Sequence, residues 1–258
     1  MSLGFCIYHM VVDVDTALNA FVKIVDRLGL SGERVVVEAP KRIRRKRMAI
    51  DRLESFNSIF SELDAFSFES ISSLSPDAVA SNDAPHVTYR RGTGLDQMMI
   101  FSPEQADLCN FAKQFLRDIP GKYGFGMDWN RPGSFFGYTA GIDDFGSLGR
   151  RFFGISDAGR WGTLYLQNYS TVFDEPIIRD IYPVNLLTTA HLDREACDGT
   201  VRDLVREHKE WGEITKLAED WFLWCVPASE IDAARNAFES RGLLKNNPSG
   251  FFRQGDGN

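Results

Sequence analysis

The sequence lacks the long apolar runs that would place it inside a membrane. No segment of its 258 residues reaches the roughly 18 consecutive apolar residues that a membrane-spanning helix needs. The apolar start, residues 1–14, has no basic leader and meets Asp13 and Asp15 early, so it favours a first strand over a secretory signal. We therefore predict a cytoplasmic protein that makes no contact with a membrane.

Cysteine and histidine are also scarce, with four of each. The cysteines lie far apart and form no CxxC pair, so we expect free thiols that fill the core in a reducing cytoplasm. A structural zinc site needs about four converging ligands, and the histidines share no metal-type spacing with one another or with cysteine. We therefore predict neither a metal ion nor another cofactor. The residues concerned are Cys6, Cys109, Cys197, Cys225, His9, His86, His191 and His208.

Catalytic motifs are missing as well. The stretch 121–126 (GKYGFG) has neither the GK[ST] ending of a P-loop nor the GxGxxG spacing, so we expect tight turns or close strand packing there. No GxSxG nucleophile motif occurs. The carboxylate pairs Asp143-Asp144 and Asp174-Glu175 are neighbours in sequence, which point to opposite faces on a strand, so exposed acidic loops are favoured over acid/base pairs. We predict no catalytic residue; the alternative is a metal- or carboxylate-dependent hydrolase of unknown substrate built from dispersed carboxylates.

Charge of one sign dominates the middle of the chain. The net charge is −7, but residues 1–60 hold 10 basic and 7 acidic residues, whereas residues 61–220 hold 15 basic and 25 acidic residues. An acidic region repels phosphates and suits a basic protein partner, so we expect no direct contact with nucleic acid. The run Lys41–Arg47 (KRIRRKR) is the exception. We interpret it as a solvated approach to a helix, with a nucleic-acid or phosphate patch as the alternative.

The apolar pattern predicts an α+β fold. Strand and helix patterns alternate without a strict βαβ rhythm, and no convincing linker divides them. We therefore predict a single domain over residues 1–245, with a mixed or largely antiparallel sheet packed by helices, and a loose C-terminal tail over 246–258. The expected strands are 3–12, 34–38, 65–71, 86–90, 95–101, 177–187 and 221–226, and the expected helices are 13–28, 49–63, 102–119, 200–208 and one capped by Ser229.

All five tryptophans follow residue 128. Trp221 and Trp224 lie in an apolar run and are expected in the core. Trp129 lies in a polar, turn-like setting, and tryptophan is enriched at binding hot spots, although a structural plug is the other interpretation. The candidate partner contacts are Trp129, Asp143, Asp144, Asp174 and Glu175.

The second half of the chain resembles a known family. The segments that carry the likeness are Ile178–Leu187 (IRDIYPVNLL), His191-Leu192, Gly199–Leu204 (GTVRDL), Trp211–Ile214 (WGEI), the strand around Trp224 and Arg241–Leu244 (RGLL). In this order they resemble the immunity protein 52 family of bacterial polymorphic toxin systems. The likeness covers about residues 120–245 and rests on Tyr-Pro, Asn-Leu-Leu and spaced tryptophans.

The resemblance implies a cytoplasmic immunity protein that binds and neutralises a cognate toxin. Such toxins are delivered by type VI secretion systems and include nucleases of restriction-endonuclease type. An acidic inhibitor surface would complement the basic groove of a nuclease, in agreement with the charge distribution. The other hypotheses are the hydrolase named above and a nucleic-acid-associated protein that acts through Lys41–Arg47.

Overall fold

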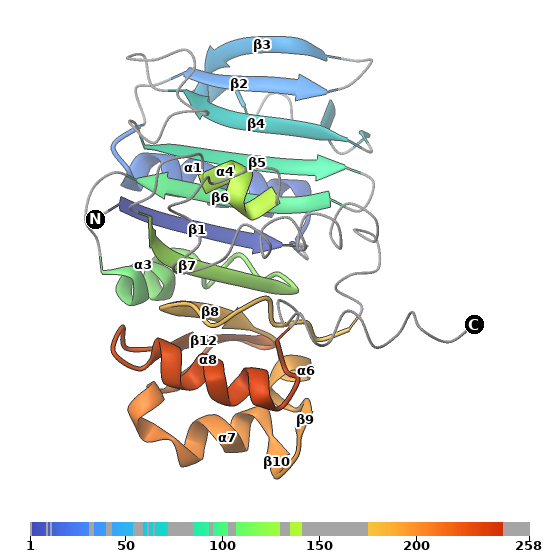
Figure 1. The fold of residues 1–258 in the computed structure, drawn as a ribbon. Helices are drawn as coiled ribbons and strands as arrows, with labels where there is room; N and C mark the ends of the chain where they lie inside the picture. The colour runs from blue at the N-terminus through green and yellow to red at the C-terminus, as the bar shows by residue number, and fades with distance from the viewer. Residues whose placement is uncertain are drawn as a thin grey trace.

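A ten-stranded antiparallel sheet organises the chain into a single α+β domain (Figure 1). The strand order is β11-β12-β8-β7-β1-β6-β5-β4-β2-β3. Its strands are β1 (Ser2–Tyr8), β2 (Arg34–Ala39), β3 (Ile43–Ala49), β4 (Phe66–Ile71), β5 (His86–Gly92), β6 (Leu95–Ser102), β7 (Tyr123–Trp129), β8 (Val184–Leu187), β11 (Ile214–Ala218) and β12 (Trp221–Cys225). The predicted fold class is confirmed. The computed structural model of the chain describes residues 2–8, 10, 12–30, 34–39, 43–53, 59–60, 62–63, 65–71, 85–92, 95–102, 107–129, 135–140 and 175–244.

Helices cover both faces of this sheet. In Figure 1, α1 lies behind the strands, and α4 and α8 lie in front of them. The helices are α1 (Val14–Arg27), α3 (Leu108–Phe115), α4 (Phe135–Ala140), α6 (Thr189–Leu192), α7 (Val201–Glu207) and α8 (Ile231–Ser240), with 3-10 turns η1 (Ile50–Arg52) and η4 (Lys209–Trp211) and a small hairpin of β9 (Glu195–Ala196) and β10 (Gly199–Thr200).

Strand β1 shows how the two faces divide the core. Phe5 and Ile7 pack into the cluster that contains α1 and α3, whereas Cys6 and Tyr8 pack into the cluster that contains α4, α7 and α8. Successive side chains on a strand point to opposite faces, so a central strand that is covered on both sides must be apolar throughout. This arrangement explains why the chain has so many large apolar residues.

Local sequence signals fix several element ends. The Oδ1 atom of Asp13 accepts a hydrogen bond from the Thr16 amide at 2.8 Å and caps α1. The helix ends before Gly29, whose φ of 70° suits a residue without a side chain. Both boundaries agree with the prediction for residues 13–28.

Several elements differ from the prediction. Of residues 177–187, which were expected to form one strand, only Val184–Leu187 form a strand, β8. The helix expected from residue 102 begins only at Leu108, because Asp107 caps it through the Asn110 amide (3.0 Å), and Ser102 still belongs to β6. The described part of Lys41–Arg47 lies in β3, the last strand on one side of the sheet, which leads into η1; no strand was expected there. Exposed charge on an end strand opposes pairing with other chains. The tail 246–258 lies outside the described residues.

The glycine-rich stretch serves close strand packing, as expected. A Cβ atom on Gly126 would collide with the ring of Phe5 on the neighbouring strand. A Cβ atom on Gly124 would lie 2.9 Å from the carbonyl oxygen of Cys6. The stretch is therefore part of the core of the sheet.

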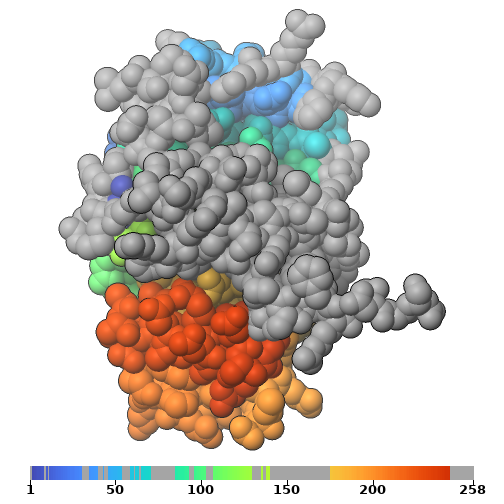
Figure 2. Space-filling view, viewed as in Figure 1, coloured from blue at the N-terminus to red at the C-terminus, as the bar shows by residue number. Residues whose placement is uncertain are grey.

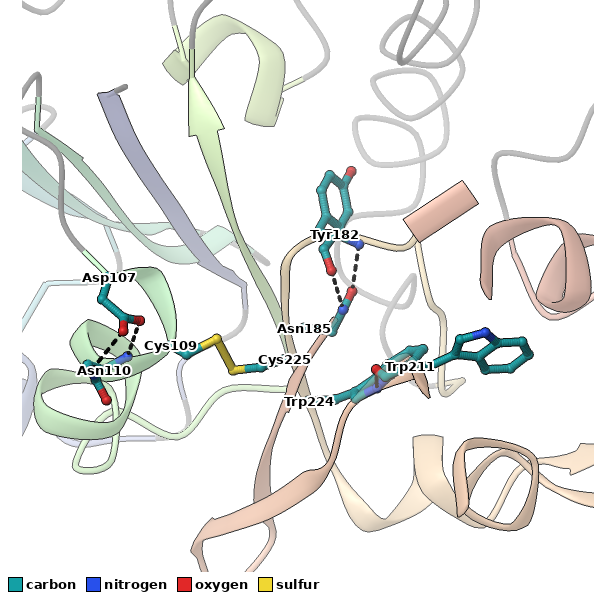
Figure 3. The surroundings of a disulfide bond; sticks show 8 residues. All are labelled: Asp107, Cys109, Asn110, Tyr182, Asn185, Trp211, Trp224 and Cys225. Atoms are coloured by element: carbon teal, nitrogen blue, oxygen red, sulfur yellow. Dashed lines mark hydrogen bonds between the residues drawn. A yellow bond between two sulfur atoms is a disulfide. The ribbon is translucent and has the colours of Figure 1, made fainter. Parts of the chain in front are cut away.

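A disulfide bond joins Cys109 on α3 to Cys225 at the end of β12 (Figure 3). The prediction of four free thiols is therefore wrong for this pair, whose Cα atoms lie 6.1 Å apart. Cys6 and Cys197 are free, and Cys6 is buried. Spacing along the chain could not reveal a pair that lies 116 residues apart, because only the fold brings α3 beside β12.

Candidate partner-binding surface

The residues expected to contact a partner have different surroundings. Trp129 is only 1% exposed and packs edge-on against the ring of Phe135, with centroids 5.3 Å apart. It is a core residue in this structure, so the prediction that it contacts a partner is not supported and the structural-plug interpretation holds. Glu175 is exposed. Asp143, Asp144 and Asp174 lie outside the described residues.

A groove of about 550 Å³ lies between α7 and the end of the sheet. Helix α7 and turn η4 form one wall, and β11 with β12 forms the other. Helix α7 belongs to the orange, lower end of the molecule in Figure 2. The groove is lined by Arg202, Val205, Arg206, Lys209, Gly212, Glu213, Ile214, Lys216 and Phe222.

A capping box fixes the start of α7, which carries two of the cationic lining residues, Arg202 and Arg206. The Thr200 hydroxyl accepts a hydrogen bond from the Asp203 amide at 3.2 Å, and the Asp203 carboxylate accepts one from the Thr200 amide at 3.1 Å. The hydrogen bond from the Thr200 side chain also lowers the pKa of Asp203. With the helix start fixed, the spacing of four residues places Arg202 and Arg206 on one side of α7, and Lys209 follows in η4.

Gly212 sets the turn from η4 into β11. Its φ of 88° and ψ of −171° are accessible almost only to glycine, and a Cβ atom there would collide with the carbonyl of Cys225. The preceding Trp211 is buried, and its carbonyl accepts a hydrogen bond from Nε1–H of Trp224 at 2.9 Å (Figure 3). This hydrogen bond connects η4, in one wall of the groove, to the buried strand β12.

The lining of the groove is basic over an apolar floor. Four of its nine lining residues are cationic and one, Glu213, is acidic. Lys209 and Lys216 are exposed, whereas the floor residue Phe222 is 9% exposed. The guanidinium carbon of Arg202 lies 5.4 Å from the ring centroid of Phe222, which places a cation beside the apolar floor.

A second hollow, between α1 and α3, has no such bias. Lys23 and Arg27 line it together with Asp26 and Asp118. The Lys23 and Asp118 side chains lie 4.0 Å apart and are both largely exposed. Because its charges are balanced, this hollow does not select a partner by the sign of its charge.

The buried polar groups serve the core. Arg179 is 0% exposed, and its guanidinium donates to the Tyr138 carbonyl at 3.1 Å and to the Tyr8 hydroxyl at 3.3 Å. Its guanidinium carbon lies 4.4 Å from the centroid of the Tyr138 ring, a stabilising cation–π distance. Arg179 thus connects the segment before β8 to α4 and β1.

His191 is buried, and its pKa is shifted. Burial lowers its pKa from 6.5 to about 4. The neutral ring donates from Nε2 to the Ile177 carbonyl (3.1 Å), while Nδ1 accepts from the Thr188 hydroxyl (2.8 Å). His191 is therefore a core residue whose two ring nitrogens both have hydrogen-bond partners.

The described residues form neither a metal-binding cluster nor a membrane-spanning helix. Within the described ranges, no group of three or more histidine, cysteine, aspartate or glutamate residues is placed to hold a metal ion. In the same part of the chain, no helix is long and apolar enough to cross a membrane.

The chain is similar in structure to the Pseudomonas aeruginosa T6SS protein PA0821. The TM-score is 0.57 and the sequence identity 11%, over 94% of this chain and 73% of that chain. No family model matches the chain, and no curated protein matches it. At this identity the likeness shows a shared fold.

The basic groove was not among the sequence-based candidates. One signal was present: the four-residue spacing of Arg202 and Arg206 in the helix predicted over 200–208, with Lys209 directly after it. Lys216 could not be assigned to the same site from sequence, because only strand pairing places β11 beside the helix. The net acidity of residues 61–220 also concealed a local cluster of positive charge.

Proposed function

We propose that this chain is an immunity protein that binds and neutralises a cognate toxin of a type VI secretion system, with no chemistry of its own. The observation that carries the proposal is the fold shared over 94% of the chain with a T6SS protein. The sequence resemblance to immunity protein 52, which covers residues 120–245, supports the same class independently of that comparison. A nuclease is the toxin activity that this resemblance implies.

The proposed mode of action is formation of a tight complex that blocks the toxin. A stable protein complex buries roughly 1,600 Å² in total, so the contact surface must extend well beyond one groove. The exposed carboxylate of Glu175 fits the expected acidic part of this surface, and the groove between α7 and β11 adds a basic part.

Co-expression tests the proposal directly. The protein encoded by the adjacent gene is induced in a bacterial host with and without this chain, and growth and co-purification are measured. We expect the chain to restore growth and to co-purify in a defined stoichiometry. If the adjacent gene product stays toxic and forms no complex, the proposal fails.

The location of the encounter is a separate part of the proposal. A nuclease acts on nucleic acid in the cytoplasm, and we propose the same compartment for this chain. Disulfides persist in oxidising compartments and are rare in the cytosol, so the Cys109–Cys225 pair reports the location. A cytoplasmic encounter requires this pair to be reduced in cells, and acid quenching of cells followed by thiol alkylation measures that state. An oxidised pair in cells would move the proposed encounter to the periplasm.

A further inference from the structure

We infer that the groove between α7 and β11 receives an acidic segment of the toxin, in which carboxylates flank an apolar side chain. This inference rests on the proposed function and names the chemistry of the partner. It is carried by the charge of the groove, the exchangeable partners of its cations and its apolar floor.

The cations come from three elements on two walls of the groove. Helix α7 and η4 contribute Arg202, Arg206 and Lys209, and β11 contributes Lys216 from the opposite wall. Like charges that are held this close raise the local potential, which attracts carboxylates and increases the rate of association. Neither Lys209 nor Lys216 forms an ion pair with another residue of the described ranges.

The two arginines already have partners, but these pairs are weak. Arg202 lies 3.2 Å from the carboxylate of Asp193, and Arg206 lies 3.4 Å from that of Asp203. Solvent-exposed ion pairs contribute little to stability, so a better-placed carboxylate can replace them. The arginines are therefore available to a partner at small cost.

The floor of the groove selects against a purely ionic ligand. Val205, Ile214 and Phe222 line it, and the Val205 and Phe222 side chains are buried. An apolar side chain inserted between the cations would cover this floor and remove it from water. A nucleic-acid backbone offers phosphates without such a group, and the net charge of −7 on the whole chain opposes it.

The sheet provides a main-chain contact for an extended segment. Strand β11 is the last strand on this side of the sheet in the described part of the chain. An extended peptide can pair with an end strand, while its side chains enter adjacent pockets. The register shift in β11 between Lys216 and Ala218 limits such pairing to the first half of the strand, which borders the groove.

Charge reversal with a matched control tests the inference. Lys209→Glu with Lys216→Glu removes two groove cations, and Lys113→Glu with Arg117→Glu makes the same change in net charge at exposed positions on and just after α3. All four side chains are exposed, so circular dichroism and melting temperature should match the unmodified chain. Affinity for the purified adjacent gene product is measured by calorimetry at two salt concentrations.

We expect the groove variant to bind about 100-fold more weakly, since facing like charges cost several kcal/mol. Its affinity should also depend less on salt, because fewer attractive charges are left to screen. The control variant should bind within about twofold of the unmodified chain. Equal affinity of the groove variant and the control would overturn the inference and leave the proposed function intact. Absence of any complex with the unmodified chain would instead refute the proposed function, and the inference with it.

Zero-length carbodiimide cross-linking gives an independent result on the native complex. It couples a lysine amine to a carboxylate in direct contact, so mass spectrometry should find Lys209 or Lys216 joined to an aspartate or glutamate of the toxin. Cross-links confined to other lysines would contradict the inference. Titration with a 20-base-pair DNA duplex tests nucleic acid as the alternative ligand of the groove. If the unmodified chain binds the duplex and the groove variant does not, nucleic acid replaces the acidic segment as the ligand.

Discussion

Removal of the Cys109–Cys225 bond should lower the free energy of unfolding of this domain by several kcal/mol. The bond joins α3, which precedes the central strand β7, to the end of β12 (Figure 3). Replacing both cysteines with serine opens a loop that spans 116 residues of sequence. The unfolded chain then gains conformational entropy, while the packing of the native state changes little.

The size of the effect follows from the length of the loop. For a sequence separation of 116 residues, the chain-entropy relation gives about 5 kcal/mol. A domain of this size loses about 2–4 °C in melting temperature per kcal/mol, so the expected decrease is roughly 10–20 °C. The fold should persist, because the Trp221 indole still donates to the Leu116 carbonyl at 3.2 Å and holds α3 against β12.

Urea unfolding of the purified, unreduced chain and of the double serine variant measures this difference. Cys197→Ser is the control, because this thiol is exposed and free, and surface changes of this kind stay within about 0.5 kcal/mol. Thiol counting adds a check. Cys197 should react in the native chain, and Cys6 should react only after unfolding, because burial raises its pKa to about 12. Four reactive thiols in denaturant without reductant, or equal unfolding free energies, would refute the reasoning.

Three further predictions concern single residues. His191 has a pKa of about 4 in the folded chain and 6.5 when unfolded, so the unfolded state binds more protons between these two pH values. The free energy of unfolding should therefore fall by about 2 kcal/mol from pH 7 to pH 5. The variant His191→Gln should lose this part of the pH dependence in urea titrations. Gly212→Ala should cost about 1–3 kcal/mol, because alanine is strained at this φ and ψ and its methyl group meets the Cys225 carbonyl, and an unchanged urea midpoint would contradict the geometry. Trp129→Ala should cost about 3–5 kcal/mol in the free energy of unfolding. Trp129→Phe should keep toxin affinity within about twofold in calorimetry, whereas a large loss of affinity in a folded Phe variant would restore Trp129 as a contact.

The sequence alone determined much of the local structure. The 3.6-residue period between Asp13 and Gly29 defined α1, and the strand patterns at 86–90 and 95–101 defined β5 and β6. These signals are short-range: they depend on which residues are neighbours within one element, so they survive without any knowledge of the rest of the fold.

Prediction failed where the outcome depended on distant partners. The polar neighbours of Trp129 indicated a surface turn. The residue is instead the last one of the central strand β7, and its ring packs against Phe135 of α4. The basic run at 41–47 was interpreted as an approach to a helix, but its described part pairs with β2 as part of strand β3. Burial and strand pairing are decided by contacts between elements, and these contacts leave no fixed spacing in the sequence.

The sequence by itself determined the class of fold, the absence of familiar catalytic motifs and the resemblance to an immunity family. Tertiary structure decided which cysteines pair, which tryptophans are inaccessible and which cations share a site. The physical reason is that Cys109 with Cys225, and Arg202 with Lys216, belong to different elements that meet only after ten strands have assembled into one sheet.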